Sequence, residues 1–191
     1  MIVDLGTGDG RAVLARAAAE PRSLVIGIDA NAAAIAESSR LASRGSGAGR
    51  LSNVLFLVAP AEALPGPLGA VASIVTVVMP WGSLLRGVLG LDDVVLRGIA
   101  SIVVPGGRVE ILVSVTPADA AAGLAPLDGD AMAGIAAAWA AAGFELLSMR
   151  PAALDDVRQA RSSWARRLGD RPIWRIELGR RHHPGPPRSD L

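Results

Sequence analysis

A glycine-rich loop near the start of the chain is the first feature whose residue types and spacing could do chemistry. It reads Asp4-Leu5-Gly6-Thr7-Gly8-Asp9-Gly10-Arg11 and follows a short apolar run. Glycines permit a tight turn and a close approach of the backbone to a ligand, and the helix that follows presents free N–H groups. The spacing G-x-G-x-G differs from the G-x-G-x-x-G preferred for a pyrophosphate. The acid before the first glycine would repel a phosphate, so the loop indicates a ligand with an ammonium group or a fixed hydration network.

A second acidic residue, Asp29, follows the loop at a position suited to bind the ribose of a nucleoside. Asp29 ends the apolar run at 25–29, and a carboxylate at this point can accept hydrogen bonds from both hydroxyls of a ribose. Ala61 and Glu62 follow the next apolar run, where the edge of an adenine would lie. We therefore predict a nucleoside cofactor. NAD is the rival ligand, and a loop whose glycines only form a turn is the alternative to any ligand site.

Two of the four tryptophans stand at positions that suggest binding. Trp81 comes just after an apolar run, at the carboxyl edge where open α/β sheets bind ligands. Trp164 is flanked by arginines, and such a pair of residue types can stack a nucleobase above a surface that binds phosphates. Packing is the alternative for both side chains. Trp139 and Trp174 are expected to belong to the core.

Composition narrows the class of protein. The chain has 191 residues, of which 51% are hydrophobic, so one domain with a large buried core is expected. It has no cysteine, which excludes thiol catalysis, disulfides and Cys-ligated zinc. The net charge is only +1, yet ten arginines face five acids from Arg150 to the end. With no long apolar span or export signal, we expect a soluble cytoplasmic protein that binds no membrane, and we predict no metal site.

Short β-rich runs alternate with alanine-rich helical stretches, which predicts an α/β fold with a mainly parallel sheet and helices on both faces. We expect strands at residues 1–5, 23–29, 54–59, 73–79, 108–114, 144–149 and 173–178, all covered on both faces because their apolar character is continuous. We expect helices near residues 11–19, 31–44, 92–103, 130–142 and 155–168. Asp92 and Asp93 would start the third helix, and Pro105-Gly106-Gly107 would stop it. The arrangement suits a Rossmann-like, doubly wound sheet of seven strands with an antiparallel last strand at its edge. Residues 1–178 would form a single domain, and 179–191 a disordered basic tail.

Three strings in this order and spacing carry a specific resemblance. They are DLGTGDGR at 4–11, MPWGSLLRGVLG at 79–90 and SSWARRL at 162–168. The first is similar to the D/E-x-G-x-G-x-G motif of class I S-adenosylmethionine-dependent methyltransferases. Together they resemble the aminoglycoside-resistance 16S rRNA methyltransferases, which modify N1 of the decoding-site adenine at position 1408 and include the kanamycin and apramycin resistance enzymes. The resemblance covers roughly residues 1–178. It implies that a monomer of this chain acts on 16S rRNA in the assembled 30S subunit.

The resemblance also implies roles for individual residues. Trp81 and Trp164 would clasp a flipped adenine, and Ser162 would help position it. Contacts with the rRNA backbone would come from Arg166, Arg167 and Arg171. The cofactor would be held by Asp4, Gly6, Gly8, Asp29, Ala61, Glu62, Val78, Met79, Pro80, Trp81, Gly82, Ser83, Ser162, Ser163 and Trp164.

The expected chemistry needs positioning rather than a general base. Adenine N1 carries a lone pair that is free at neutral pH, so attack on a methyl group requires only alignment. No polar residue that would grip an exocyclic amine precedes Pro80, which agrees with this target. Two other interpretations remain open. One is a methyltransferase for a small metabolite, with a closed apolar pocket and no use for the arginines at 166–171. The other is a cofactor-binding homologue with weak or no activity.

Overall fold

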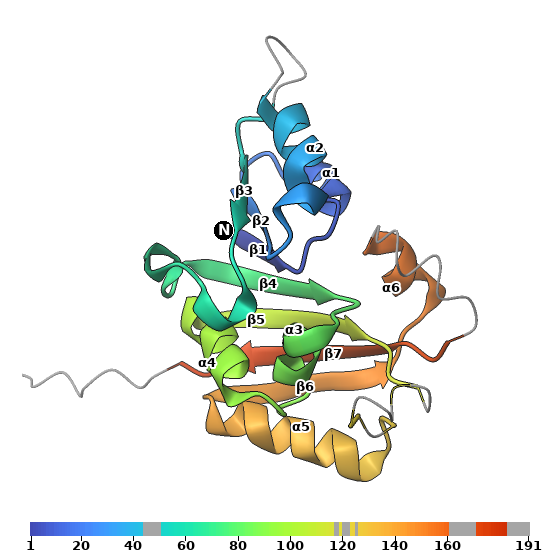
Figure 1. Cartoon of the computed structure of the whole chain (residues 1–191). Helices are drawn as coiled ribbons and strands as arrows, with labels where there is room; N and C mark the ends of the chain where they lie inside the picture. The colour runs from blue at the N-terminus through green and yellow to red at the C-terminus, as the bar shows by residue number, and fades with distance from the viewer. Residues whose placement is uncertain (44–50, 117–118, 120–122, 125, 161–170, 183–191) are drawn as a thin grey trace, which may run out of the picture.

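The computed structural model describes residues 1–43, 51–116, 119, 123–124, 126–160 and 171–182, and it shows a seven-stranded sheet with helices packed against it (Figure 1). The strands are β1 (Ile2–Leu5), β2 (Val25–Asp29), β3 (Val54–Val58), β4 (Ala72–Val78), β5 (Val103–Val113), β6 (Phe144–Pro151) and β7 (Trp174–Arg180). The α-helices are α1 (Arg11–Ala19), α2 (Ala32–Ser43), α3 (Gly82–Val88), α4 (Asp93–Ile102), α5 (Gly129–Ala141) and α6 (Leu154–Gln159). Two 3-10 turns, η1 (Ala61–Ala63) and η2 (Gly66–Leu68), separate β3 from β4.

The order of strands across the sheet is β3-β2-β1-β4-β5-β7-β6. Strands β1 to β5 are parallel to one another, and β7 is antiparallel to both β5 and β6, so the predicted antiparallel last strand is confirmed. The expectation that it lies at the edge is wrong, because β7 lies between β5 and β6. Its Ile176 and Leu178 are fully buried there. From β1 the strand order runs to β2 and β3 on one side and to β4 and β5 on the other. The point between β1 and β4 is therefore the topological switch point, where open α/β sheets bind ligands.

One face of the sheet carries the main hydrophobic core. Alternate residues of every parallel strand, such as Val3, Ile26 and Val75, pack against α3, α4 and α5. Trp139 of α5 is fully buried, lies edge-on to Phe144 with ring centroids 5.1 Å apart, and donates its indole N–H to the carbonyl of Val88 at 3.0 Å. The predicted core role of Trp139 is therefore confirmed. Trp174 is only partly buried and packs against the same core.

The second face of the sheet is apolar at one end and charged at the other. Under α1 and α2 a smaller apolar cluster joins Ile2, Val25 and Val54 to Val13 and Ala17. Across β5 and β7 the same face carries charged side chains instead. Glu110 lies directly opposite Glu177 in the antiparallel ladder. The expectation of apolar cover on both faces is therefore wrong for much of β5 and β7, because an apolar residue alternates with a charged one over 108–111 and 174–178.

Several local boundaries differ from the predicted ones. Asp92 caps α4 as expected, since its carboxylate accepts hydrogen bonds from the backbone N–H groups of Val94 and Val95. The helix nevertheless ends at Ile102, before Pro105, and β5 begins at Val103 with an irregular register next to β4. Helix α3 was not predicted at all. Strand β7 continues to Arg180, two residues into the segment expected to be a tail, and residues 183–191 lie outside the described residues.

Candidate active site

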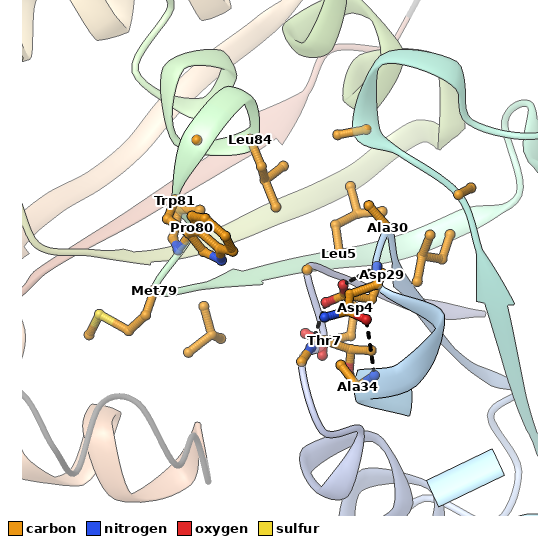
Figure 2. A pocket seen from close by; sticks show the side chains of 18 of the residues that line it. Asp4, Leu5, Thr7, Asp29, Ala30, Ala34, Met79, Pro80, Trp81 and Leu84 are labelled. Atoms are coloured by element: carbon orange, nitrogen blue, oxygen red, sulfur yellow. Dashed lines mark hydrogen bonds between the residues drawn. The ribbon is translucent and has the colours of Figure 1, made fainter. Parts of the chain in front are cut away.

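A pocket of about 920 Å³ lies at the carboxyl ends of β1, β2 and β4. Figure 2 shows Asp4, Thr7 and Asp29 on one side of it and Met79, Pro80 and Trp81 on the other. Its volume falls within the usual range of small-molecule sites, roughly 300–1,000 Å³. The pocket therefore lies at the topological switch point of the sheet, as the position of the glycine loop predicted.

The glycine loop forms one wall of the pocket and is fastened to the end of β2. The N–H groups of Gly6 and Thr7 both donate to the carbonyl of Ile28, at 2.8 and 3.1 Å. Gly8 has a positive φ of 59°, and a Cβ on it would meet nothing within 4 Å. That open space lets a ligand approach the backbone of the loop closely, which a side chain would prevent.

Asp29 joins the loop to the start of α2. One carboxylate oxygen accepts the N–H of Gly8 and the other accepts the N–H of Asn31, both at 2.8 Å. An ionised carboxylate has about four acceptor positions, so two stay free for further donors. Asp29 is therefore both the structural link between two loops and an acceptor with room for two hydroxyl groups.

Asp4 lies deeper, at the end of β1, and is paired with a residue of the neighbouring strand. The hydroxyl of Thr76, on β4, donates to its carboxylate at 2.5 Å. Burial raises the pKa of Asp4 above its ordinary value, and the hydrogen bond from Thr76 acts in the opposite direction. A cation placed in the pocket beside Asp4 would compensate this cost of burial.

The opposite wall turns sharply at the end of β4. Met79 has a φ of 50°, a left-handed conformation that is strained for a residue with a side chain, and Gly82 has a φ of 62°. Between them Trp81 begins α3, and 84% of its surface is exposed. A large aromatic side chain held this far out of the core, at the mouth of a pocket, is typical of a binding surface.

The structure brings together every described residue that was predicted to contact the cofactor. They all line the pocket and are Asp4, Gly6, Gly8, Asp29, Ala61, Glu62, Val78, Met79, Pro80, Trp81, Gly82 and Ser83. Ser162, Ser163, Trp164, Arg166 and Arg167 lie outside the described residues. Arg171 is described, is exposed, and does not line the pocket.

Sequence reasoning missed several contributors, of which three illustrate the reasons. Thr76 could have been noticed as the one polar residue in the run at 74–78. Leu84 contacts the glycine loop, because a Cβ on Gly6 would come within 2.7 Å of it, but it belongs to the unpredicted α3. Ala160 also lines the pocket, and nothing in its sequence context distinguishes it.

The described residues contain neither a metal-binding cluster nor a membrane-spanning helix. No group of three or more His, Asp or Glu side chains there could hold a metal ion. Among the helices that the structure describes, none has the length and apolar character needed to cross a membrane.

Comparison with known proteins identifies the family. Residues 1–173 match the model of the NpmA family, described as 16S rRNA (adenine(1408)-N(1))-methyltransferase. The chain belongs to this family. A relative of that name from Streptoalloteichus hindustanus is 36% identical over 173 residues, which cover 88% of this chain and 80% of the relative.

Solved structures of similar proteins agree. The crystal structure of the 16S rRNA (adenine(1408)-N(1))-methyltransferase from Catenulisporales acidiphilia, as a mutant with its cosubstrate S-adenosylmethionine (SAM), is 30% identical. It superposes with a TM-score of 0.84 and covers all of this chain and 88% of its own. The aminoglycoside resistance methyltransferase NpmB1 is 38% identical with a TM-score of 0.78, over 94% of this chain and 86% of its own. The sheet order and antiparallel β7 are those of the class I methyltransferase fold.

The residues of this pocket fit SAM. The free acceptor positions of Asp29 suit a ribose, the buried carboxylate of Asp4 suits an ammonium group, and the open space at Gly8 admits the ligand next to the loop. The family assignment and the pocket therefore point to the same cofactor.

Proposed function

We propose that this chain transfers a methyl group from SAM to N1 of adenine 1408 in 16S rRNA, with Trp81 stacking on the flipped adenine. The observation that carries the proposal is the position of Trp81, an almost fully exposed tryptophan at the mouth of a pocket whose other wall is the SAM-type glycine loop. The family to which the chain belongs modifies that base, and its members include an aminoglycoside resistance enzyme.

On the cofactor side, three features of the pocket match three parts of SAM. Asp29 accepts the ribose hydroxyls, and Asp4 lies where the ammonium group of the methionine part would compensate its buried charge. Ala61 and Leu64 supply an apolar surface for the adenine, with Glu62 at its edge. Bound there, SAM supplies a sulfonium methyl group, which is an electrophile.

On the target side, the protein must hold a base outside the RNA stack. Flipping a nucleotide costs a few kcal/mol, and stacking on an aromatic side chain returns about 1–3 kcal/mol per contact. Trp81 provides one such contact. Trp164, with Ser162 beside it in the sequence, would provide the second, from a segment outside the described residues.

The methylation step needs alignment and no proton transfer. The lone pair of N1 forms the new bond to the methyl carbon while the carbon–sulfur bond breaks and its electron pair stays on sulfur. The product adenine carries the positive charge. Since no proton leaves, the described pocket residues act by binding and orientation.

For the RNA surface, we propose that Arg166, Arg167 and Arg171 bind phosphates of 16S rRNA in the assembled 30S subunit. Arginine binds a phosphate with two parallel hydrogen bonds, and the C-terminal part of the chain is its basic part. Contacts of this type weaken steeply with salt, so binding to 30S should fall as the salt concentration rises. We propose a monomer as the active form, which sedimentation of the protein alone would test.

The test is methyl transfer from labelled SAM to purified 30S subunits, followed by reverse transcription across the decoding site. The expected result is label in 16S rRNA and a stop opposite adenine 1408, because an N1 methyl group blocks Watson–Crick pairing. Protein-free 16S rRNA is the matched substrate control and should be a much poorer acceptor. SAM binding without a stop at this base would overturn the proposal.

A further inference from the structure

Helix α6 contributes no fully buried side chain to the fold. It has six residues, Leu154–Gln159, none of which is buried, and Leu154 at its start is 75% exposed. Its first residue is preceded by Ala153, whose side chain cannot cap a helix. Figure 1 shows α6 standing away from α1 and α2, beyond the ends of the central strands. Something other than apolar packing must hold the helix in place.

A network of charges on the second face of the sheet holds it. The carboxylate of Asp156 accepts two hydrogen bonds from Arg150, at 2.7 and 3.0 Å, and one from the N–H of Ala153 at 2.7 Å. It also pairs with Arg175 of β7 at 3.4 Å. The side chain of Asp156 is 12% exposed, which makes this the best-shielded carboxylate among the ion pairs of the described residues.

The same network explains why charges face each other across the strands. Arg150 and Arg175 are register partners on β6 and β7, and Asp156 lies between their guanidinium groups. Arg175 continues the chain of pairs to Glu177 at 2.5 Å and to Glu110 at 3.6 Å. Among the described residues, Asp156 is the one member of this network that belongs to α6, and it therefore links the helix to the sheet.

The end of α6 separates two cavities. Ala160, the residue after the helix, lines the cofactor pocket and also a second cavity of about 520 Å³ between α1 and α6. Asp4 and Val78 line both cavities as well. A displacement of α6 would widen both spaces and admit more water beside Asp4, and water weakens an ion pair by raising the local dielectric constant.

We propose that Asp156 is a positioning residue for cofactor binding: held by Arg150 and Arg175, it anchors α6 so that Ala160 closes the methionine end of the pocket beside Asp4. This rests on the proposed binding of SAM in that pocket. The proposal gives the carboxylate of Asp156 a role in SAM binding although this side chain does not line the cofactor pocket.

The experiment compares two ligands by calorimetry on wild type and Asp156→Asn. SAM carries the methionine part, whereas methylthioadenosine has the same nucleoside and sulfur but no ammonium or carboxylate. Asp156→Asn should bind SAM about tenfold more weakly, the scale of one lost charge-assisted contact, and methylthioadenosine within about twofold of wild type. Asp156→Glu, which keeps the charge, should recover most of the SAM affinity.

The matched control is Asp155→Asn, one residue earlier on the same helix. Among the described residues Asp155 pairs only with Arg158, at 3.5 Å, and its side chain is 78% exposed, so its loss should change neither affinity. Equal loss of both ligands in Asp156→Asn, or loss of neither, would overturn the positioning role. If Asp156→Asn fails to fold, Arg150→Gln tests the same link. Failure of wild type to bind SAM would instead overturn the proposed function.

Discussion

The two walls of the pocket are built in opposite ways. The cofactor wall, around the glycine loop and Asp29, is held by hydrogen bonds to the backbone and lies over an apolar core under α1 and α2. The target wall, around Trp81, is held by a strained turn at the end of β4. The first wall is complete without any partner. The second exposes an aromatic side chain at the mouth of the pocket.

The largest effect is expected from a substitution in the cofactor wall, measured as a loss of SAM affinity. Asp29→Ala removes the acceptor for the ribose and leaves the N–H groups of Gly8 and Asn31 without their partner. Each hydrogen bond to a charged group is worth about 1.5–3 kcal/mol, so SAM affinity should fall by about a hundredfold or more in calorimetry. Glu37→Ala on α2, which removes only an exposed pair with Arg40, is the control. Unchanged affinity in Asp29→Ala would contradict the ribose assignment.

The next largest effect is expected from a change in the target wall that leaves the cofactor wall intact. Trp81→Ala should lower kcat/KM for 30S methylation by about ten- to a hundredfold, because one stacking contact of about 1–3 kcal/mol is lost. Since Trp81 is 84% exposed, the melting temperature should stay nearly the same. Leu91→Ala removes another exposed apolar side chain outside the pocket and should leave methylation unchanged. Methylation at the wild-type rate in Trp81→Ala would refute the stacking role.

A smaller effect is expected at Asp4, which lies between the two walls of the pocket. Asp4→Asn should weaken SAM binding about tenfold, because the ammonium group loses its counter-charge. The same change should stabilise the free protein at neutral pH, since burial raises the pKa of Asp4 and the ionised form is costly in the fold.

The pH dependence of stability checks the sign of this effect. Well below the ordinary Asp pKa of about 3.9, the carboxyl group is protonated in both folded and unfolded chains and costs nothing. As pH rises, the unfolded chain ionises first, so wild type should lose stability relative to Asp4→Asn until the raised pKa is passed. Melting curves of both proteins from acid to neutral pH test this. A difference that stays constant over that range would mean that Asp4 is not perturbed.

The smallest effect concerns the strained turn. Met79 and Ala70 are the two non-glycine residues with positive φ among those described. Changing either to glycine relieves strain, so the stability of each variant should stay within about 1 kcal/mol of wild type or rise. Only Met79→Gly should lower methylation, by about threefold, because Trp81 loses its fixed direction. Equal methylation in Met79→Gly and Ala70→Gly would show that the strain at Met79 serves the fold alone.

Much of the cofactor wall was predictable because its pattern is local. The glycine loop and Asp29 each follow a strand, and parallel strands bring their carboxyl ends to one edge of the sheet. Trp81 was predicted from its motif, but its exposure and the left-handed Met79 were not. Helix α3 was missed because its short apolar run has no polar capping residue, and the capping position is Trp81 itself.

The sequence by itself determined the alternation of strands and helices, the loop and its acid, and the motifs that mark the family, because these depend on neighbours along the chain. Only the tertiary structure decided the place of β7 between β5 and β6, the pair of Asp4 with Thr76, and the contact of Asp156 with Arg175. Strand register and side-chain packing bring those partners together across long separations in sequence. The sequence shows that these residues are charged or polar, but it does not show which residue each of them will contact.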